Sequence, residues 1–250
     1  MKSVVYVFRF ILLSVLLVNL LSACKSDAKV LPLVQETAHA RFYSPNDDAA
    51  HTVAILAEAF EANYDRLTAL FQYEAQDKAI IHVYTDRDTY QKMIGRDTEG
   101  TYDARDRIIK VYTPADLSNE TTRRNFNEQI VHEFVHLIIQ QISPNVGKVK
   151  WLDEGTAYYA SGQLEKEMLE KPVYYDIPTF EEFADPDYFN KARGAAYFYS
   201  GLIVKYIADH YGVETLNAII LQPEQKHVEK ILNTSLEQFF AEWRNAMLNS

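Results

Sequence analysis

A His-Glu-x-x-His pattern at residues 132–136 constrains this chain more than any other feature of its sequence. Two histidines four positions apart share one helix face, with Cβ atoms roughly 5–6 Å apart, so both imidazoles can reach one metal ion. Glu154 follows in an aromatic-rich Trp-Leu-Asp-Glu-Gly segment and supplies a third candidate ligand. Because catalytic zinc sites combine three protein ligands with one open position, the pattern predicts that His132, His136 and Glu154 bind Zn²⁺.

A different interpretation treats His132 and His136 as hydrogen-bonded core histidines and Glu133 as a paired buried acid. The flanking residues are mostly apolar. Burying three ionisable groups among them is costly unless an ion compensates their charge and polarity. The metal interpretation therefore explains the pattern with fewer assumptions.

The N-terminal segment has the features of an export signal. Basic residues precede an apolar run from Phe10 to Leu21, and the segment closes on Leu-Ser-Ala-Cys. That ending resembles the lipobox of bacterial lipoproteins, which implies cleavage after residue 23 and lipidation of Cys24, the only cysteine. The alternative is an uncleaved membrane anchor with an incidental cysteine. Either interpretation places the domain outside the cytoplasm, and lipidation of Cys24 would attach it to a membrane.

Composition indicates a single acidic domain behind this leader. We expect a signal peptide at residues 1–23, a lipidated cysteine and tether at 24–40, and one domain at 41–250. Removing residues 1–23 takes two of the 25 basic residues and none of the 35 acidic ones, so the formal charge moves from −10 to −12. A chain with this negative charge would repel a polyanion, so nucleic acid is disfavoured as a partner.

Hydrophobic periodicity predicts an α+β fold, with a small N-terminal mixed sheet and helices followed by a mainly helical C-terminal half. The motif helix is expected over residues 121–142, apolar nearly all round and therefore buried. A helix from about residue 151 to 162 carries Glu154. Further helices are expected over residues 49–71, 88–94, 195–211 and 235–248, strands over 79–84 and 107–112, and a hairpin over 100–106.

The chain resembles the gluzincin metallopeptidases, and among them the compact peptidase MA-like type of bacterial exported proteins. The resemblance covers roughly residues 100–212 and is carried by the His-Glu-x-x-His pattern, by residues 151–157 and by a weaker match that begins at Tyr197. It implies a metallopeptidase fold, a zinc cofactor, a peptide or protein substrate and a catalytic tyrosine. Tyr199 lies one helical step beyond Tyr197 and is the alternative tyrosine.

Two departures narrow the resemblance. Tyr158 stands where thermolysin-like enzymes carry an aspartate, so the aminopeptidase branch of the family fits better. Nothing before residue 132, however, matches the element with which that branch anchors a free amino terminus, so the resemblance does not support exopeptidase activity.

These motifs give each residue an expected role. Glu133 is adjacent to a ligand on the helix and is expected to act as the general base. Tyr197 is the expected oxyanion donor, and the strand at 107–112 is expected to pair with an extended substrate. Asp153 either orients an imidazole or is a solvated carboxylate at a helix N-terminus, while His82, Asp209 and His210 are expected to be structural or surface residues.

The leading hypothesis is an extracytoplasmic, lipid-anchored zinc endopeptidase. The alternative is a non-catalytic binding or scaffold lipoprotein that retains a metallopeptidase fold. A zinc hydrolase acting on a non-peptide amide is a third hypothesis, because its water chemistry is the same.

Overall fold

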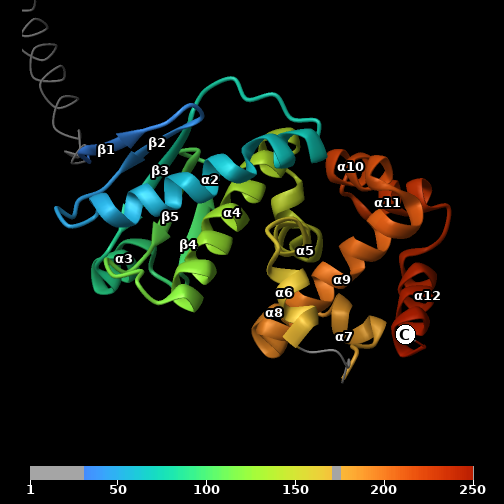
Figure 1. Ribbon diagram of the computed structural model, residues 1–250. Coiled ribbons are helices and arrows are strands. Elements are labelled where there is room, and N and C mark those ends of the chain that lie inside the picture. Colours follow the sequence, from blue (N-terminus) through green and yellow to red (C-terminus); the bar gives the residue numbers. More distant parts are fainter. Residues whose placement is uncertain (1–30, 171–175, 250) are drawn as a thin grey trace, which may run out of the picture. The chain divides into compact units, whose positions relative to one another are not determined.

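The computed structural model describes residues 31–170 and 176–249, of which those from Pro32 onward belong to one compact unit. Within them, a five-stranded mixed sheet precedes a long run of helices (Figure 1). This confirms the predicted order of a small N-terminal sheet and a mainly helical C-terminal half. Cys24 and the predicted export signal lie outside the described residues. No described helix has the length and apolarity needed to span a membrane.

The sheet has the strand order β1-β2-β3-β5-β4. The two outer pairs, β1 with β2 and β4 with β5, are antiparallel, whereas β2 with β3 and β3 with β5 are parallel. The strand predicted at 79–84 has those bounds in the structure. The strands are β1 (Leu33–Glu36), β2 (Ala40–Tyr43), β3 (Ala79–Tyr84), β4 (Gly100–Asp103) and β5 (Ile108–Tyr112).

The first strand corrects the predicted tether at residues 24–40. β1 pairs with β2 and belongs to the compact unit, so the domain begins near residue 32 and not at 41. β1 is an edge strand of four residues, and its Leu33 side chain is half exposed. Such a short, poorly buried strand carries little alternation of apolar and polar residues, and the sequence gives no clear signal for it.

The predicted pairing of a substrate with the strand at 107–112 is also wrong. β5 lies between β3 and β4, so both of its edges already have partners. The hairpin that joins β4 to β5 folds β4 over the outer edge of β5. Consequently, β4 and β1 are the edge strands of this sheet.

Two long helices pack against each other and against the sheet (Figure 1). They are α2 (Ala50–Leu70) and α4 (Glu120–Ile142), which carries the metal motif, and both match their predicted ranges within one residue at most ends. Phe134 of α4 contacts Phe60 and Tyr64 of α2, with ring centroids 4.4 and 5.6 Å apart. The shorter α3 (Arg87–Ile94) ends at Gly95, whose φ of 74° favours glycine.

The remaining helices form the C-terminal half. Residues 163–170 and 225–232 are helical although no helix was predicted there. The helices are η1 (Val146–Lys148), α5 (Lys150–Ala160), α6 (Gln163–Glu170), α7 (Phe180–Ala184), α8 (Tyr188–Ala192), α9 (Gly194–Tyr211), α10 (Val213–Leu221), α11 (Gln225–Leu232) and α12 (Leu236–Leu248).

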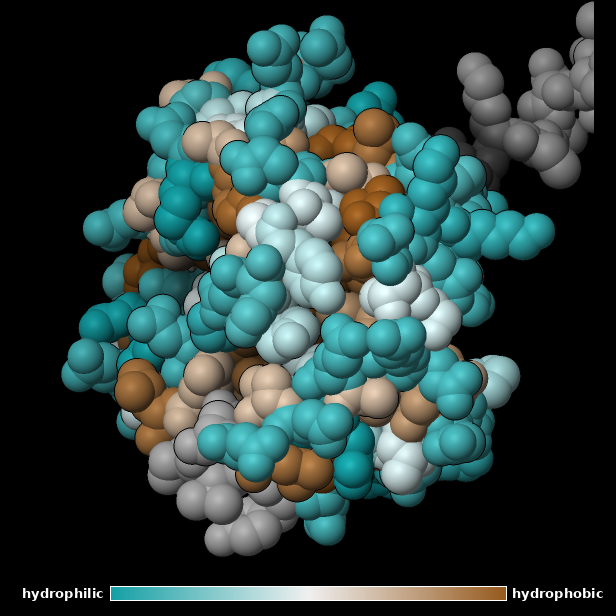
Figure 2. Space-filling model, turned by 90° about the vertical axis from the view of Figure 1, so that its right-hand side faces the viewer, coloured by the Kyte–Doolittle hydropathy of each residue, from teal (hydrophilic) through white to brown (hydrophobic). Residues whose placement is uncertain are grey.

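The closest helix crossing in this half joins α5 and α9. A Cβ on Gly155 of α5 would lie 2.5 Å from the backbone oxygen of Ser200 on α9, so only glycine permits this approach. On the face formed by α10, α11 and α12, hydrophobic residues are interspersed with hydrophilic ones (Figure 2). Leu221 and Leu248, both more than half exposed, stand on different helices there.

Candidate metal centre

The structure brings the three predicted ligands together at one point between α4 and α5. The Nε2 atoms of His132 and His136 lie 3.0 Å apart, and Glu154 Oε2 lies 3.4 Å from each of them. A tetrahedral zinc ion with bonds of about 2.0–2.1 Å holds its ligand atoms about 3.3 Å apart. This group therefore has the spacing needed to hold a metal ion.

The outer nitrogen of each imidazole faces an acceptor. His132 Nδ1 lies 2.8 Å from Gln163 Oε1, and His136 Nδ1 lies 3.0 Å from Asp153 Oδ1. Asp153 is held in turn by Gln140, whose Nε2 donates to both carboxylate oxygens at 3.1 Å. In the tautomer in which each Nδ1 donates to its acceptor, both Nε2 lone pairs point inward toward the Glu154 carboxylate, and in the absence of a metal a proton on Nε2 takes that place. A cation would stabilise these two lone pairs and the carboxylate, which converge in a buried space. The residues therefore fit a bound metal.

The pKa values of the same residues follow from this convergence. Burial alone would raise the pKa of Glu154, but hydrogen bonds with His132 and His136 outweigh it and hold that pKa far below its usual range. Burial likewise opposes a charged His136, yet the carboxylates of Asp153 and Glu154 raise its pKa well above the usual value. Glu154 is therefore ionised at neutral pH, as a metal ligand must be.

Glu133 lies beside the ligands and is almost completely buried. Burial raises the pKa of Glu133, and the two neighbouring imidazoles only partly oppose that rise. Gln129 Nε2 donates to Glu133 Oε1 at 2.8 Å, which fixes one carboxylate oxygen. A Cβ on Gly100, the first residue of β4, would overlap both Glu133 Oε1 and Gln129 Nε2. The absence of a side chain at Gly100 thus makes room for the predicted general base.

A cleft of about 880 Å³ opens onto this centre. Tyr197 of α9 lines it together with the three ligands, whereas Tyr199 is buried against Trp243, with ring centroids 6.3 Å apart. Of the two tyrosines considered as the oxyanion donor, Tyr197 is therefore the one that lines the cleft, together with Tyr102 and Tyr158. Burial, assisted by the Glu154 and Glu133 carboxylates, raises the pKa of Tyr197 to about 12, so its phenol stays protonated and able to donate at neutral pH.

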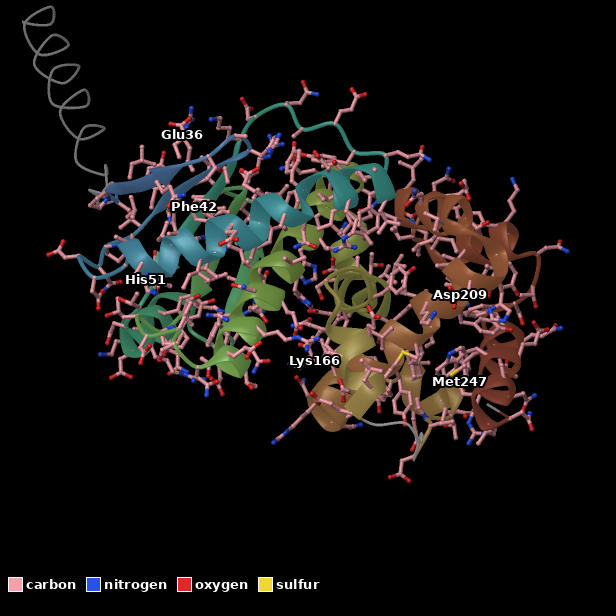
Figure 3. All side chains as sticks on the ribbon, in the orientation of Figure 1. Glu36, Phe42, His51, Lys166, Asp209 and Met247 are labelled. Carbon is pink, nitrogen blue, oxygen red and sulfur yellow. The ribbon has the colours of Figure 1, made fainter. Side chains whose placement is uncertain are left out.

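The position of Tyr197 depends on the α5–α9 crossing. Gly155 directly follows Glu154, and Ser200 lies one helical turn beyond Tyr197, so the close approach at these residues brings Glu154 and Tyr197 to one wall of the cleft. The Tyr197 ring also packs edge-on against Phe189, with centroids 5.3 Å apart. At the α6 side of the cleft, Lys166 reaches across to Asn125 and Glu128 of α4 (Figure 3).

The structure also places the other residues to which the sequence analysis gave a role. Asp153 orients His136, which decides between its two predicted roles, and His82 lies on β3 outside the metal group. Asp209 and His210 are exposed near the end of α9, where Asp209 pairs with Lys205 at 2.6 Å (Figure 3). These residues were expected to be structural or on the surface.

Sequence reasoning missed four residues that support the centre. Gln129 and Gln140 stand four positions before Glu133 and four after His136, so helical spacing alone could have identified both. Gly100 was interpreted only as a turn residue. Gln163 carries no comparable signal, because it reaches His132 from a separate helix that was not predicted.

No family model matches the chain, and no curated protein shows significant similarity to it. The molecule is a mixed α/β domain in which His132, His136 and Glu154 could hold a metal ion.

Proposed function

We propose that this chain is an exported, lipid-anchored zinc endopeptidase of the gluzincin type. The observation that carries the proposal is the convergence of His132, His136 and Glu154 beside a buried, hydrogen-bonded Glu133. Two histidines and a carboxylate are a ligand set of catalytic zinc sites. The cleft above them is large enough for several residues of a peptide.

Zinc, when bound by these three residues, supplies Lewis acidity that acidifies a water molecule and polarises the scissile carbonyl. Glu133 takes the proton of the attacking water. Its Oε1 accepts the hydrogen bond from Gln129, which leaves Oε2 to receive that proton. As the peptide C–N bond breaks, Glu133 returns the proton to the leaving nitrogen, so the carboxylate is regenerated.

Tyr197 and β4 complete the proposed site. The Tyr197 phenol donates a hydrogen bond to the oxygen that develops negative charge, an interaction that is strongest in the transition state. β4 takes the substrate-pairing role first assigned to β5, because Gly100, Thr101 and Tyr102 line the cleft and β4 is an edge strand. An extended peptide can add to such an edge by main-chain hydrogen bonds.

The cellular part of the proposal rests on the sequence alone. The Leu-Ser-Ala-Cys ending supports lipidation of Cys24 and attachment to a membrane outside the cytoplasm. Mass spectrometry of the protein from the membrane fraction of its own host tests it: a diacylated Cys24 at the N-terminus supports the anchor, and an intact leader contradicts it.

The test of function is zinc content and peptide cleavage in the wild type and two variants. We expect about one zinc per chain in the wild type and in Glu133→Gln, and none in Glu154→Ala, because Glu154 is a proposed ligand and Glu133 is not. A peptide library should be cleaved by the wild type and not measurably by Glu133→Gln. A folded protein without zinc contradicts the hydrolase, whereas zinc without any cleavage favours the binding or scaffold alternative.

A further inference from the structure

Three basic side chains line the cleft, although the chain as a whole carries a net charge of −10. They are Arg96, Lys148 and Lys150. Taking the proposed peptidase function as the starting point, we propose that the cleft selects substrates that carry a carboxylate near the scissile bond, and that Lys148 and Lys150 bind this group. The carboxylate belongs either to an acidic side chain or to a free C-terminus.

The acidic and basic residues of the cleft wall differ in whether they have charged partners. The acidic residues of the cleft are already engaged within the protein, whereas in residues 31–170 and 176–249 none of the three basic residues forms an ion pair with a carboxylate. The basic side chains are therefore the charged groups of the cleft wall that can bind a ligand. Glu133, Asp153 and Glu154 belong to the metal centre, and Asp97 and Glu99 pair with Arg87, at 3.5 and 3.7 Å, outside the cleft lining.

The position of Lys150 on α5 brings its side chain close to the metal centre. Lys150 precedes Glu154 by four residues on α5, so the two share a helix face with Cβ atoms about 5–6 Å apart. An extended peptide advances about 3.3 Å per residue. A carboxylate bound by Lys150 thus belongs to a residue within about two or three positions of the scissile bond.

The two ammonium groups are held near the cleft without being neutralised. Lys150 Nζ lies 4.7 Å from the centre of the Phe189 ring, and Lys148 Nζ donates to Asn145 Oδ1 at 2.9 Å. Both lysines lie at the N-terminal end of α5, where positive charge is unfavourable for the helix dipole. Helix stability therefore does not explain them.

The other end of the cleft is bounded by a net acidic surface. A smaller cavity of about 290 Å³ adjoins the cleft at Tyr158 and Gln163, and its lining includes Glu167 and Glu170 as well as Glu128, which pairs with Lys166 of the same lining at 3.4 Å. Tyr158 is eight residues beyond Lys150 on α5, which places the two ends about 12 Å apart along the helix. Attraction at one end and like-charge repulsion at the other together fix the direction of an acidic substrate.

The experiment measures peptide binding and cleavage separately in the zinc-loaded full chain. The probes are hexapeptides of alanine with one phenylalanine, in which glutamate occupies each other position in turn. Every peptide has a glutamine counterpart, and each is made with a free C-terminal carboxylate and as the amide. Calorimetry on the Glu133→Gln variant gives affinities without turnover, and mass spectrometry of wild-type digests gives cleavage.

Carboxylate-bearing peptides are expected to bind on the order of tenfold more tightly than their neutral counterparts at low salt, and the preference should weaken as salt is added. Introducing Lys148→Gln and Lys150→Gln together should remove the preference. The matched control, Lys226→Gln with Lys230→Gln on α11, changes the net charge equally outside the cleft and should retain it. A preference for glutamate over glutamine identifies an acidic side chain, and a preference for acid over amide identifies a C-terminus.

The outcomes separate this inference from the proposed function. Equal affinity for all four peptide types overturns the inference, as does a preference that survives loss of both lysines. Wild-type cleavage without any charge preference overturns the inference and leaves the peptidase intact. Selective binding that depends on both lysines, without cleavage by the wild type, supports carboxylate selection and overturns the peptidase.

Discussion

The two faces of helix α4 are buried to the same extent but are stabilised in different ways. Every residue from 130 to 139 is buried. On one face Phe134 packs against the rings of Phe60 and Tyr64. Burying a large apolar side chain of this kind contributes about 1.5–3 kcal/mol relative to leaving it exposed.

On the other face the buried groups are polar and depend on partners. His132 and His136 meet Glu154 at their inner nitrogens and Gln163 or Asp153 at their outer ones. Burial without those partners would be destabilising. Burial alone therefore does not reveal whether a helix face contributes to stability or to a binding site, whereas the polar partners of its side chains do.

The largest expected effect concerns the metal face. His136→Ala removes one of three ligands, so zinc content should fall from about one to near zero per chain, and proposed activity should be lost with it. The loss of affinity should exceed the roughly 100-fold that removal of an outer partner causes. Elemental analysis and circular dichroism measure zinc and fold together, and one zinc per folded variant chain would contradict the ligand assignment.

The apolar face should respond in the opposite way. Phe134→Ala leaves a cavity beside Phe60 and should lower the free energy of unfolding by about 3–5 kcal/mol, while each folded chain still binds one zinc. Urea unfolding of metal-free protein measures the loss. Leu169→Ala is the control, because Leu169 is 79% exposed and its removal should change stability by less than about 0.5 kcal/mol.

A smaller effect tests the partners of the metal face. Gln163→Ala removes the acceptor of His132 Nδ1 and should weaken zinc affinity by about 10- to 100-fold, without abolishing binding. Competition with a zinc chelator gives the affinity. Glu165→Ala alters an exposed residue on the same helix and should leave affinity unchanged, so an equal loss in both variants would indicate a general effect on α6.

The smallest expected effect is a pH dependence of metal-free stability. The pKa of His136 is raised in the folded protein, so the stability from its charged form is complete below about pH 6.5 and is lost as pH rises through the folded pKa. Zinc binding requires the neutral imidazole, so its added stability should grow with pH over the same range. Urea unfolding between pH 6 and 9, with and without zinc, measures both trends, and parallel curves would contradict the assignment.

The sequence predicted those parts of the molecule whose signals are local. A helical repeat located α4 and placed His132 and His136 on one face, and β-branched residues located β3. Contacts between distant segments left no such signal. Gln163 reaches His132 from another helix, and a Cβ at Gly100 would displace the Glu133 and Gln129 side chains only once β4 lies against α4.

The edge strands were missed for a related reason. Which strand lies outermost depends on how the hairpin of β4 and β5 folds back onto β3, and that is a property of the whole sheet. Likewise, four residues suffice for β1 because β2 supplies its hydrogen-bonding partner. A local sequence pattern therefore predicts whether a segment is a helix or a strand more readily than it predicts which segments lie beside it.

The division of the predicted ligands between α4 and α5 has a consequence for the order in which the metal centre forms. An unfolded chain keeps only the histidine pair within one short stretch, because Glu154 joins it only when α5 has docked on α4. Two ligands hold a metal ion far less tightly than three, so strong metal affinity arises with the fold and not before it. For the proposed zinc peptidase this means that the metal is acquired where the chain completes folding.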